Sequence, residues 1–508
     1  MLIHDFLKNA ANKNKIAVVH DKNRINYGEL NNLSDAFATA LCREGVQKGD
    51  RVIMSLNNSI EYLIAYFAIL KTGAVIVALD TKLVSREFLN VYKNSAPKAI
   101  ITDEKNYHAI QKIINIDDDI KLLSIDKNSI TDQTVPFNCP PCSENDLAMI
   151  IYTSGTTGTP KGVMVSHLNL SANADSIIKY LHLTEKDRVM VVLPFFYSYG
   201  NSLLTTHIKC GGTLVINNRF LFPNVVLEEM VSEEVTGFAG VPSSFSILIN
   251  KSSIRKYRFP KLRYITQAGG AMPPQMVEDF LGIIPDVQFY IMYGQTEASA
   301  RLTYLEPNYL MKKIGSVGKA IPGVELVIVN KAGTPVMPWK INKTGLIGEA
   351  GETGEIMAKG KNIMQGYWNS PDETALTIKD GWLCTGDIAR VDEDAFIYII
   401  DRKKDIIKSG ANRISPLEIE NIVLQLPYVH ECAAVGIKDD LLGEAIYLFV
   451  VVDGFSIEKK DILLYCHKNL ASYKLPKKIK FVDELPKTSS GKIKRQILKD
   501  AELPDHRC

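Results

Sequence analysis

The sequence predicts an α/β fold: a large N-terminal domain of several subdomains around mostly parallel sheets, then a small α+β domain. Three observations support this fold class. The chain has 508 residues, which is more than one hydrophobic core usually supports. Patterns of buried strands and amphipathic helices alternate along most of its length. A charge-rich segment, residues 401–416, then precedes about a hundred residues with helix and strand patterns of their own.

The N-terminal elements follow a strand–helix rhythm. Apolar residues at helical spacing begin at Leu30, and residues 49–56 have the pattern of a turn and a buried strand. Ser59 suits the N-cap of a second helix, and residues 73–79 form the next expected strand. The inner face of that second helix is expected to carry Ile60, Leu63, Ile64 and Phe67.

Three later segments complete the expected order. Residues 147–153 form a buried strand by their apolar run, and residues 395–400 form another. Residues 416–426 form an expected helix, which begins with a proline suited to a first helical turn. The charge-rich segment between the last two elements is the best candidate for a boundary. We therefore expect one domain at residues 1–401 and a second at residues 402–508.

The composition argues against several classes of function. The 59 basic residues nearly balance the 57 acidic ones, and the net charge of +2 gives no reason to expect nucleic acid or an anionic membrane as the main partner. The N-terminus lacks the pattern of a signal peptide, and no long apolar run is present. Eight scattered cysteines fit a reducing compartment. We therefore expect a cytoplasmic protein without a transmembrane segment.

Cys139 and Cys142 form the one close pair of cysteines, in the sequence Cys-Pro-Pro-Cys. A tetrahedral metal site needs a second such pair or nearby histidines, and a Pro-rich connector surrounds this pair instead. We interpret the pair as two incidental thiols in a loop, and any further role stays open.

Residues 152–163, with the sequence YTSGTTGTPKGV, begin where the strand at residues 147–153 ends. Their glycines permit close approach of the backbone, their hydroxyls are hydrogen-bond donors, and Lys161 supplies a cation. Together these groups suit a nest for phosphate oxygens, although the spacing differs from that of a P-loop and no helix pattern follows. Taken alone, the residues also fit a flexible linker.

The same string closely resembles the phosphate-loop signature of the adenylate-forming superfamily, which comprises acyl-CoA synthetases, stand-alone adenylation domains and firefly-type luciferases. Further segments resemble other motifs of that family, in the family's order. They are residues 25–30, 45–63, 293–298, 381–388, 401–420 and 485–495. The resemblance spans nearly the whole chain and implies the fold of that family, with a large N-terminal domain and a small, mobile C-terminal domain.

The resemblance implies an AMP-forming ligase that uses ATP, Mg²⁺ and CoA. A carboxylate is a poor electrophile, so its activation requires attack on the α-phosphorus of ATP, which gives an acyl-adenylate and pyrophosphate. This step depends on positioning and charge stabilisation more than on a protein nucleophile. The family's phosphate loop implies contacts to the β- and γ-phosphates from Thr153, Ser154, Gly155, Thr156, Thr157, Gly158 and Lys161.

The segment YGQTEA resembles the second signature of the family. Tyr293 offers a ring that can stack on adenine, with Gly294 and Gln295 beside it. Thr296 offers a hydroxyl for the α-phosphate, and Glu297 offers a hard oxygen ligand for Mg²⁺. By residue type alone, a glutamate near the end of a strand is more often a solvated surface residue, and the resemblance reverses that expectation.

Asp387 is suited to accept hydrogen bonds from the ribose hydroxyls, with Arg402 as a second polar partner. The alternative is that Asp387 caps a turn and that Arg402 is a charge in a linker. Gly269 and Gly270 lie where a flat base could approach the backbone. A simple turn at the end of a strand fits these two glycines equally well.

Lys492 follows Ser-Gly in a cluster of four basic residues and is the most specific candidate for a catalytic residue. The family's last motif implies that this lysine bridges the carboxylate and the α-phosphate during adenylation, whereas a solvated basic tail is the plain alternative. Lys404 matches the family's hinge, about which the small domain is thought to rotate between the two half-reactions. Gly410 would then lie near the channel of the thiol, although Ala411 stands where relatives commonly have a second glycine.

Residues 193–199 bear on the acid substrate. Where many family members have a histidine this chain has Tyr197, and no acidic residue is near to hold the ammonium group of an amino acid. We therefore expect a fatty, aryl or other neutral-tailed acid. Phe196, Tyr197 and Gly294 are the expected pocket residues. The four aromatic residues of the segment fit a hydrophobic core equally well; they are Phe195, Phe196, Tyr197 and Tyr199.

CoA is the expected acceptor of the acyl group. The phosphopantetheine arm of a carrier protein is chemically the same nucleophile, but we expect no fused carrier domain, because few residues follow the lysine motif. An inactive nucleotide-binding scaffold is a remote alternative, since the motif residues are all present. The sequence leaves open which acid is used, the pathway and whether a homo-oligomer forms.

Overall fold

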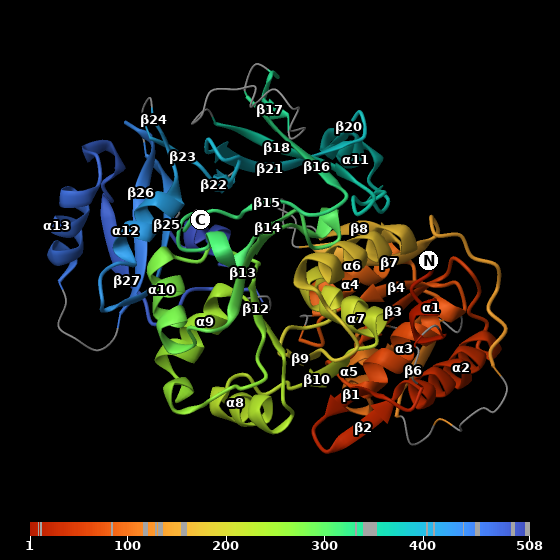
Figure 1. Ribbon diagram of the computed structural model, residues 1–508. Helices are drawn as coiled ribbons and strands as arrows, with labels where there is room; N and C mark the ends of the chain where they lie inside the picture. Colours follow the sequence, from red (N-terminus) through yellow and green to blue (C-terminus); the bar gives the residue numbers. More distant parts are fainter. Residues whose placement is uncertain are drawn as a thin grey trace.

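The computed structural model contains four sheets within the residues that it describes (Figure 1). Two of them, with seven and nine strands, belong mainly to the N-terminal part, and the others, with six and five strands, follow later along the chain. The described residues are 1–8, 10, 13–82, 85–114, 120–126, 130, 136–153, 160–330, 333–338, 353–402, 405–409, 412–439, 441–452, 458–488 and 493–502.

The seven-stranded sheet has the order β19-β8-β7-β4-β3-β5-β6. Strands β3 to β7 run parallel, as expected for strand–helix repeats. The strands are β3 (Arg51–Ser55), β4 (Val75–Ala78), β5 (Ala99–Thr102), β6 (Lys121–Ser124), β7 (Leu147–Thr153), β8 (Lys161–Ser166) and β19 (Gly366–Tyr367). The helices along this part of the chain are α2 (Tyr27–Arg43), α3 (Ile60–Lys71), α4 (Ser85–Ser95) and α5 (Glu104–Ile113).

The nine-stranded sheet has the order β15-β14-β13-β12-β11-β9-β10-β1-β2, and its strands from β13 to β1 in this order run parallel. The strands are β1 (Ile16–His20), β2 (Asn23–Asn26), β9 (Arg188–Val191), β10 (Thr213–Ile216), β11 (Gly237–Gly240), β12 (Tyr264–Gln267), β13 (Gln288–Tyr293), β14 (Thr303–Leu305) and β15 (Lys319–Ala320). The associated helices are α1 (Asp5–Lys8), α6 (His167–Leu181), α7 (Ser198–Cys210), α8 (Pro223–Ser232), α9 (Pro242–Asn250) and α10 (Pro274–Ile283).

Helix α3 lies between the two large sheets, because it contacts β4 of one sheet and β1 of the other. The Ser59 hydroxyl accepts a hydrogen bond from Tyr62 N at 3.1 Å, so the expected N-cap is present. The expectation of a single inner face for this helix is wrong. Every residue of α3 except Glu61 is buried, Tyr62 and Tyr66 included, since protein packs against the helix on all sides.

The six-stranded sheet and the C-terminal sheet are mixed or antiparallel. The first contains β16 (Val324–Val329), β17 (Pro335–Pro338), β18 (Thr353–Gly360), β20 (Ile378–Lys379), β21 (Trp382–Val391) and β22 (Ile397–Arg402), with α11 (Pro371–Thr377) beside it. The second contains β23 (Ile407–Ser409), β24 (Asn412–Ile414), β25 (Val429–Asp439), β26 (Gly443–Val452) and β27 (Lys478–Phe481). Its helices are α12 (Pro416–Val423), α13 (Lys459–Asn469) and α14 (Arg495–Asp500).

Most of the expected elements form, and some have different ends, such as the strand expected at residues 73–79, which is β4 (Val75–Ala78). Strand β22 begins at Ile397 because Ala395, with a φ of +66°, lies in a turn. Helix α12 ends at Val423, and Pro427 farther along disfavours a longer helix. The C-terminal sheet has a hydrophobic core of its own, which includes Ile419 and Leu448. A division of the chain between residues 401 and 402 stays a prediction.

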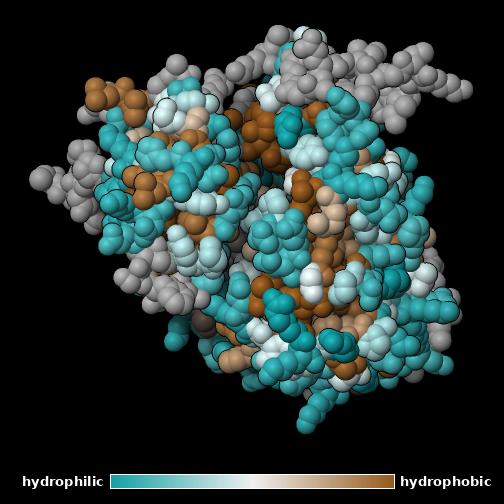
Figure 2. Space-filling model, turned by 60° about the vertical axis from the view of Figure 1, so that its left-hand side comes forward, coloured by the Kyte–Doolittle hydropathy of each residue, from teal (hydrophilic) through white to brown (hydrophobic). Residues whose placement is uncertain are grey.

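The surface is largely hydrophilic on the face that Figure 2 shows, and hydrophobic side chains form separate patches there. Among the described residues, no helix is long and apolar enough to cross a membrane. Cys139 and Cys142 are free thiols in a segment without regular secondary structure, and burial raises the pKa of both.

Candidate active site

Three loops meet at the carboxyl edge of the nine-stranded sheet. Strands β9, β12 and β13 point the same way, so the residues that follow each of them lie at one edge. The loop after β9 carries Phe196 and Tyr197, and the loop after β12 carries Gly269 and Gly270. Residues 294–297 follow β13. The Ser198 hydroxyl lies 3.4 Å from Thr296 Oγ1 and connects the first of these loops to the third.

The loop after β13 is held tightly against the segment behind it. A Cβ on Gly294 would lie 2.2 Å from the carbonyl oxygen of Ala300, so only glycine fits there. Ser299 and Ala300 have φ angles of 54° and 108°, in the left-handed region that non-glycine residues rarely adopt. This close packing holds Thr296 and Glu297 in a short 3-10 helix, η3 (Thr296–Ala298).

Glu297 is bound to a tyrosine far along the chain. Its Oε1 accepts a hydrogen bond of 2.8 Å from the hydroxyl of Tyr367 in β19. Burial, with the Glu297 carboxylate as a second cause, raises the pKa of Tyr367 well above its ordinary value. The phenol therefore keeps its proton at neutral pH and acts as a donor that orients Glu297.

Lys161, the lysine of the glycine-rich segment, stands at the start of β8 and pairs with Thr153 of β7. Its ammonium group forms an ion pair of 2.6 Å with Glu373 in α11 and lies 5.5 Å from the centre of the Tyr367 ring. Tyr367 thus contacts both Lys161 and Glu297. The glycine-rich segment joins two antiparallel strands, which agrees with the absence of a helix pattern after it.

Asp387 forms the centre of a second polar group. Its side chain is only 3% exposed and lies 3.1 Å from Arg402 Nε. Its other oxygen accepts a hydrogen bond of 2.6 Å from the Tyr293 hydroxyl. Both Asp387 and Arg402 lie in paired strands, so the alternative of a turn cap and a free linker charge does not match the structure. Because both carboxylate oxygens have partners, a ribose can reach Asp387 only by sharing or replacing one of them.

Two side-chain amides near the sheet edge each have one buried atom without a partner among the described residues. Gln267 donates from Nε2 to the carbonyl oxygen of Gly270 at 2.8 Å, while its Oε1 is buried and unpaired. Gln295 Nε2 is likewise buried and unpaired. Gly269, in the loop that follows Gln267, has a φ of +89°. One unpaired acceptor and one unpaired donor are groups that a bound polar molecule would satisfy.

The four aromatic residues of segment 195–199 divide into two pairs. Phe195 and Tyr199 belong to the hydrophobic core, and the Tyr199 hydroxyl donates to the carbonyl oxygen of Thr266 at 3.0 Å. Phe196 and Tyr197 are partly exposed, with ring centres 4.5 Å apart. The second pair therefore keeps surface that a ligand can contact.

Several predicted site residues lie outside the described residues. They are Ser154, Gly155, Thr156, Thr157, Gly158, Lys404, Gly410 and Lys492. Two of the other three basic residues of the cluster have structural partners, since Lys487 pairs with Glu431 and Arg495 pairs with the 6% exposed Glu420, while Lys494 is exposed. The role of Lys492 stays a prediction.

Tyr367 and Glu373 are not among the site residues predicted from the sequence. Both reach the site because β19 pairs with β8, which brings residues 366–373 beside the glycine-rich segment. No local pattern marks them, and only a prediction of that strand pairing would have found them.

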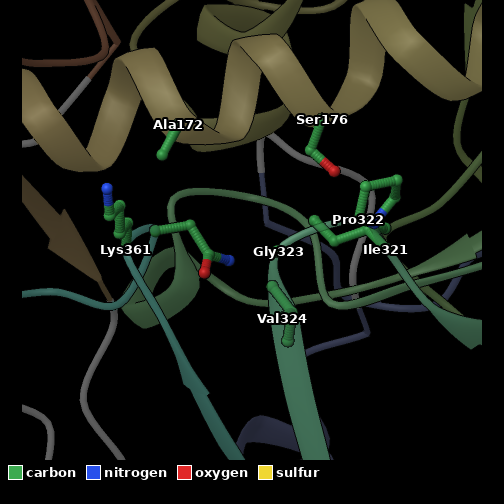
Figure 3. Close-up of a pocket in the computed structure, with 8 residues that line it drawn as sticks. Ala172, Ser176, Ile321, Pro322, Gly323, Val324 and Lys361 are labelled. Carbon is green, nitrogen blue, oxygen red and sulfur yellow. The ribbon is translucent and has the colours of Figure 1, made fainter.

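A small cavity of about 80 Å³ lies behind the loop that follows β13, between α6 and residues 321–324. Figure 3 shows the Ser176 hydroxyl pointing from α6 toward it. Asn362 also lines the cavity, and its Nδ2 donates to the carbonyl oxygens of Ala298 and Arg301 at 3.1 and 2.9 Å. Asn362 therefore supports the loop from behind. The lining is mostly apolar, but the unpaired Ser176 Oγ and Asn362 Oδ1 are groups that a water molecule in the cavity would satisfy.

Comparison with protein families identifies the chain. The model of the AMP-binding enzyme matches residues 6–368, and the model of the AMP-binding enzyme C-terminal domain matches residues 418–492. The chain belongs to the AMP-binding enzyme family. This AMP-binding enzyme is 32% identical to a feruloyl-CoA synthase of an Amycolatopsis species over 94% of each chain. It is also 32% identical to a long-chain-fatty-acid–CoA ligase of Escherichia coli, over 93% of this chain and 89% of the relative.

Solved structures confirm the fold class of the AMP-binding enzyme. The o-succinylbenzoate coenzyme A synthetase of Bacillus subtilis, in complex with its acyl-adenylate intermediate, superposes with a TM-score of 0.86 at 29% identity, over 99% of both chains. The same synthetase in complex with ATP and magnesium ion gives a TM-score of 0.84 at 29% identity, over 98% of this chain and 99% of that one. The predicted resemblance to adenylate-forming enzymes is therefore confirmed.

The residues at the sheet edge fit ATP and Mg²⁺. The unpaired Gln267 Oε1 and Gln295 Nε2 suit a polar ligand such as a nucleotide. Within the described ranges, no three His, Cys, Asp or Glu side chains gather to hold a metal ion. Mg²⁺ is usually bound by one or two carboxylates together with substrate phosphates, so the single carboxylate of Glu297 is sufficient. When bound, Mg²⁺ neutralises charge on the phosphate oxygens.

Proposed function

We propose that this AMP-binding enzyme is an AMP-forming acid–CoA ligase. It converts a carboxylic acid and ATP into an acyl-adenylate and pyrophosphate, and then transfers the acyl group to the thiol of CoA with release of AMP. The observation that carries the proposal is the contact of Tyr367 with both Glu297 and Lys161. This contact supports a single site in which the glycine-rich segment and the YGQTEA loop act on the same nucleotide.

Positioning and charge account for the first half-reaction. The acid reacts as a carboxylate, so no general base is required. Thr296 is the proposed donor to the α-phosphate, Lys161 the proposed cation for the leaving pyrophosphate, and Glu297 the proposed ligand of Mg²⁺. Lys161 is paired with Glu373 at 2.6 Å, and its ammonium group keeps further N–H donors for a phosphate. Lys492 is the proposed second cation, between the carboxylate and the α-phosphate.

A fatty or aryl acid is the proposed substrate class. Two relatives are named for feruloyl and long-chain fatty acyl groups, which have uncharged tails. The o-succinylbenzoate synthetase of the solved structures is named for an aryl acid with a second carboxylate. The partly exposed rings of Phe196 and Tyr197 suit such a tail. An α-amino acid is disfavoured, because its ammonium group would lie beside these aromatic rings without a carboxylate partner.

A substrate screen tests the proposal. Pyrophosphate release is measured with Mg-ATP and acids of graded chain length and aromatic character, and products formed with CoA are identified by mass spectrometry. Acid-dependent release together with an acyl-CoA product is the expected result. Release without a thioester of CoA would favour the loading of a carrier protein, and no release with any acid would favour an inactive scaffold. Glu297→Gln is expected to abolish release, while Glu393→Gln, on an exposed turn, serves as the matched control.

A further inference from the structure

Two large apolar side chains project from the turn that leads into α8, at the lower end of the molecule in Figure 1. Leu221 is 86% exposed and Phe222 is 67% exposed. The residues on either side of them are anchored, since Phe220 packs beside Phe238 and Pro223 is buried. The amide of Phe222 also donates to the carbonyl oxygen of Arg219 at 2.8 Å. The turn therefore holds this apolar pair away from the core.

A strongly basic segment lies beside the apolar pair. Residues 250–263 contain six basic residues and no acidic residue. The amide of Ser253 donates to Asn224 Oδ1 at 2.8 Å, and Tyr257 donates to Glu228 at 3.3 Å, so this segment is bound directly to α8. Five of its basic side chains are exposed, and none of them has an ion-pair partner among the described residues; they are Lys251, Arg255, Lys256, Arg258 and Lys261.

We propose that this surface, formed by Leu221, Phe222 and the basic segment 250–263, docks the protein on an anionic lipid bilayer. Apolar side chains insert at the boundary between headgroups and acyl chains, while nearby lysines and arginines are attracted to anionic headgroups. The apolar pair and the basic side chains each bind a bilayer only weakly by themselves. Together on this surface they give reversible binding to the bilayer. The net charge of +2 does not oppose this inference, because screening makes the local charge the relevant one.

A lipid surface fits these observations better than a protein partner. The apolar part consists of two projecting side chains, whereas a stable protein interface buries roughly 800 Å² on each partner. Unpaired basic side chains on one segment match a diffuse layer of negative charge and do not require acidic partners at fixed positions. Docking at this surface is independent of the acid that the enzyme activates.

Vesicle sedimentation of the full chain tests the proposal. We expect the protein to sediment with vesicles that contain phosphatidylserine about tenfold more than with pure phosphatidylcholine vesicles, and to dissociate as salt is raised. Leu221→Ser with Phe222→Ser should abolish sedimentation, and the triple variant Arg255→Gln, Lys256→Gln, Arg258→Gln should remove the preference for anionic lipid. Matched controls on α13 are Leu464→Ser and the triple variant Lys459→Gln, Lys460→Gln, Lys468→Gln, which should bind as the unmodified protein does.

Two further measurements serve as controls for folding and activity. Thermal unfolding and acid-dependent pyrophosphate release should be unchanged in the surface variants, which separates loss of docking from loss of folding. Failure of the unmodified protein to bind anionic vesicles, or equal binding by the surface and control variants, would overturn the proposal. A protein interface would be indicated instead if light scattering showed that the unmodified protein is a dimer and does not bind vesicles, and that the double variant Leu221→Ser, Phe222→Ser is a monomer. That result would also overturn the proposal.

Discussion

Tyr367 connects two groups that are expected to act on the same nucleotide. Its hydroxyl donates to Glu297 at 2.8 Å, and its ring lies 5.5 Å from the ammonium group of Lys161. A carboxylate that binds a metal is oriented by partners of this kind, and their removal weakens metal binding even though they do not touch the metal.

Tyr367→Phe should therefore raise the Mg²⁺ concentration needed for half-maximal pyrophosphate release by about tenfold. The size and apolar surface of the ring are kept, so the fold should be unaffected. Titration of Mg²⁺ at saturating acid measures the effect. Tyr398→Phe removes a similar hydrogen bond, to Asp392 at 3.2 Å, and is the matched control. An unchanged Mg²⁺ requirement in Tyr367→Phe would show that Glu297 is oriented without this bond.

Asp401 is a buried carboxyl group at the end of β22. Burial raises its pKa to about 7. The hydrogen-bond geometry is consistent with a protonated Asp401, since Ser415 Oγ lies 2.7 Å from the Ile400 carbonyl oxygen and 2.9 Å from Asp401 Oδ2. The single hydroxyl proton of Ser415 satisfies only one of these acceptors. A protonated Asp401 solves this conflict by donating to Ser415, which then donates to Ile400.

The stability of the protein should consequently depend on pH through Asp401. Below the ordinary pKa of 3.8 the carboxyl is protonated in both states; between 3.8 and about 7 only the unfolded chain loses its proton. Stability therefore falls as pH rises through this window and levels off above about 7, with a total loss on the order of 4 kcal/mol. Asp401→Asn should remove this dependence. Thermal unfolding of both proteins from pH 5 to 8 gives the difference, and parallel curves would contradict the assignment.

At the scale of elements, helices α2 and α3 are joined by a buried ion pair. The ammonium group of Lys71 lies 2.7 Å from Asp35 Oδ1, with side chains 4% and 8% exposed. The same ammonium group donates to Ser34 Oγ at 2.7 Å and to the carbonyl oxygen of Asn31 at 3.1 Å. Burial lowers the pKa of Lys71, and the pairing with Asp35 opposes this shift.

Asp35→Ala should destabilise the protein by about 3–5 kcal/mol, because it leaves a buried cation without its counter-charge. Replacing both partners, with Asp35→Leu and Lys71→Met, should recover much of the loss, since neither charge then needs solvation. Glu44→Ala is the control; it breaks an exposed pair with Lys121 at 3.7 Å and should cost less than about 1 kcal/mol. Urea unfolding measures all three changes. Equal losses in Asp35→Ala and Glu44→Ala would contradict the argument.

At the scale of the whole molecule, the expected rotation of the C-terminal part predicts that one lysine serves one half-reaction. Lys492→Ala should lower ATP–pyrophosphate exchange by on the order of 10²–10³ and spare thioester formation from supplied acyl-adenylate. Lys494→Ala, two residues away and exposed, is the matched control. Equal loss of both half-reactions in Lys492→Ala would indicate misfolding instead of a role limited to adenylation.

The sequence by itself determined the family, the class of reaction and most of the elements. Periodicity and contiguous motifs are properties of neighbouring residues, so α2, β7 and the YGQTEA loop follow from local patterns. The clustering of the loops after β9, β12 and β13 also follows from the strand order, because parallel strands end at a common edge of the sheet.

Only the tertiary structure decided which groups meet across long separations. The pairing of β19 with β8 brings Tyr367 and Glu373 to Lys161, and packing on all sides buries every residue of α3 except Glu61. Contact between α8 and segment 250–263 creates a basic and apolar surface on a chain whose net charge is only +2. These features depend on the pairing and packing of segments distant in the chain, and no local pattern encodes that geometry.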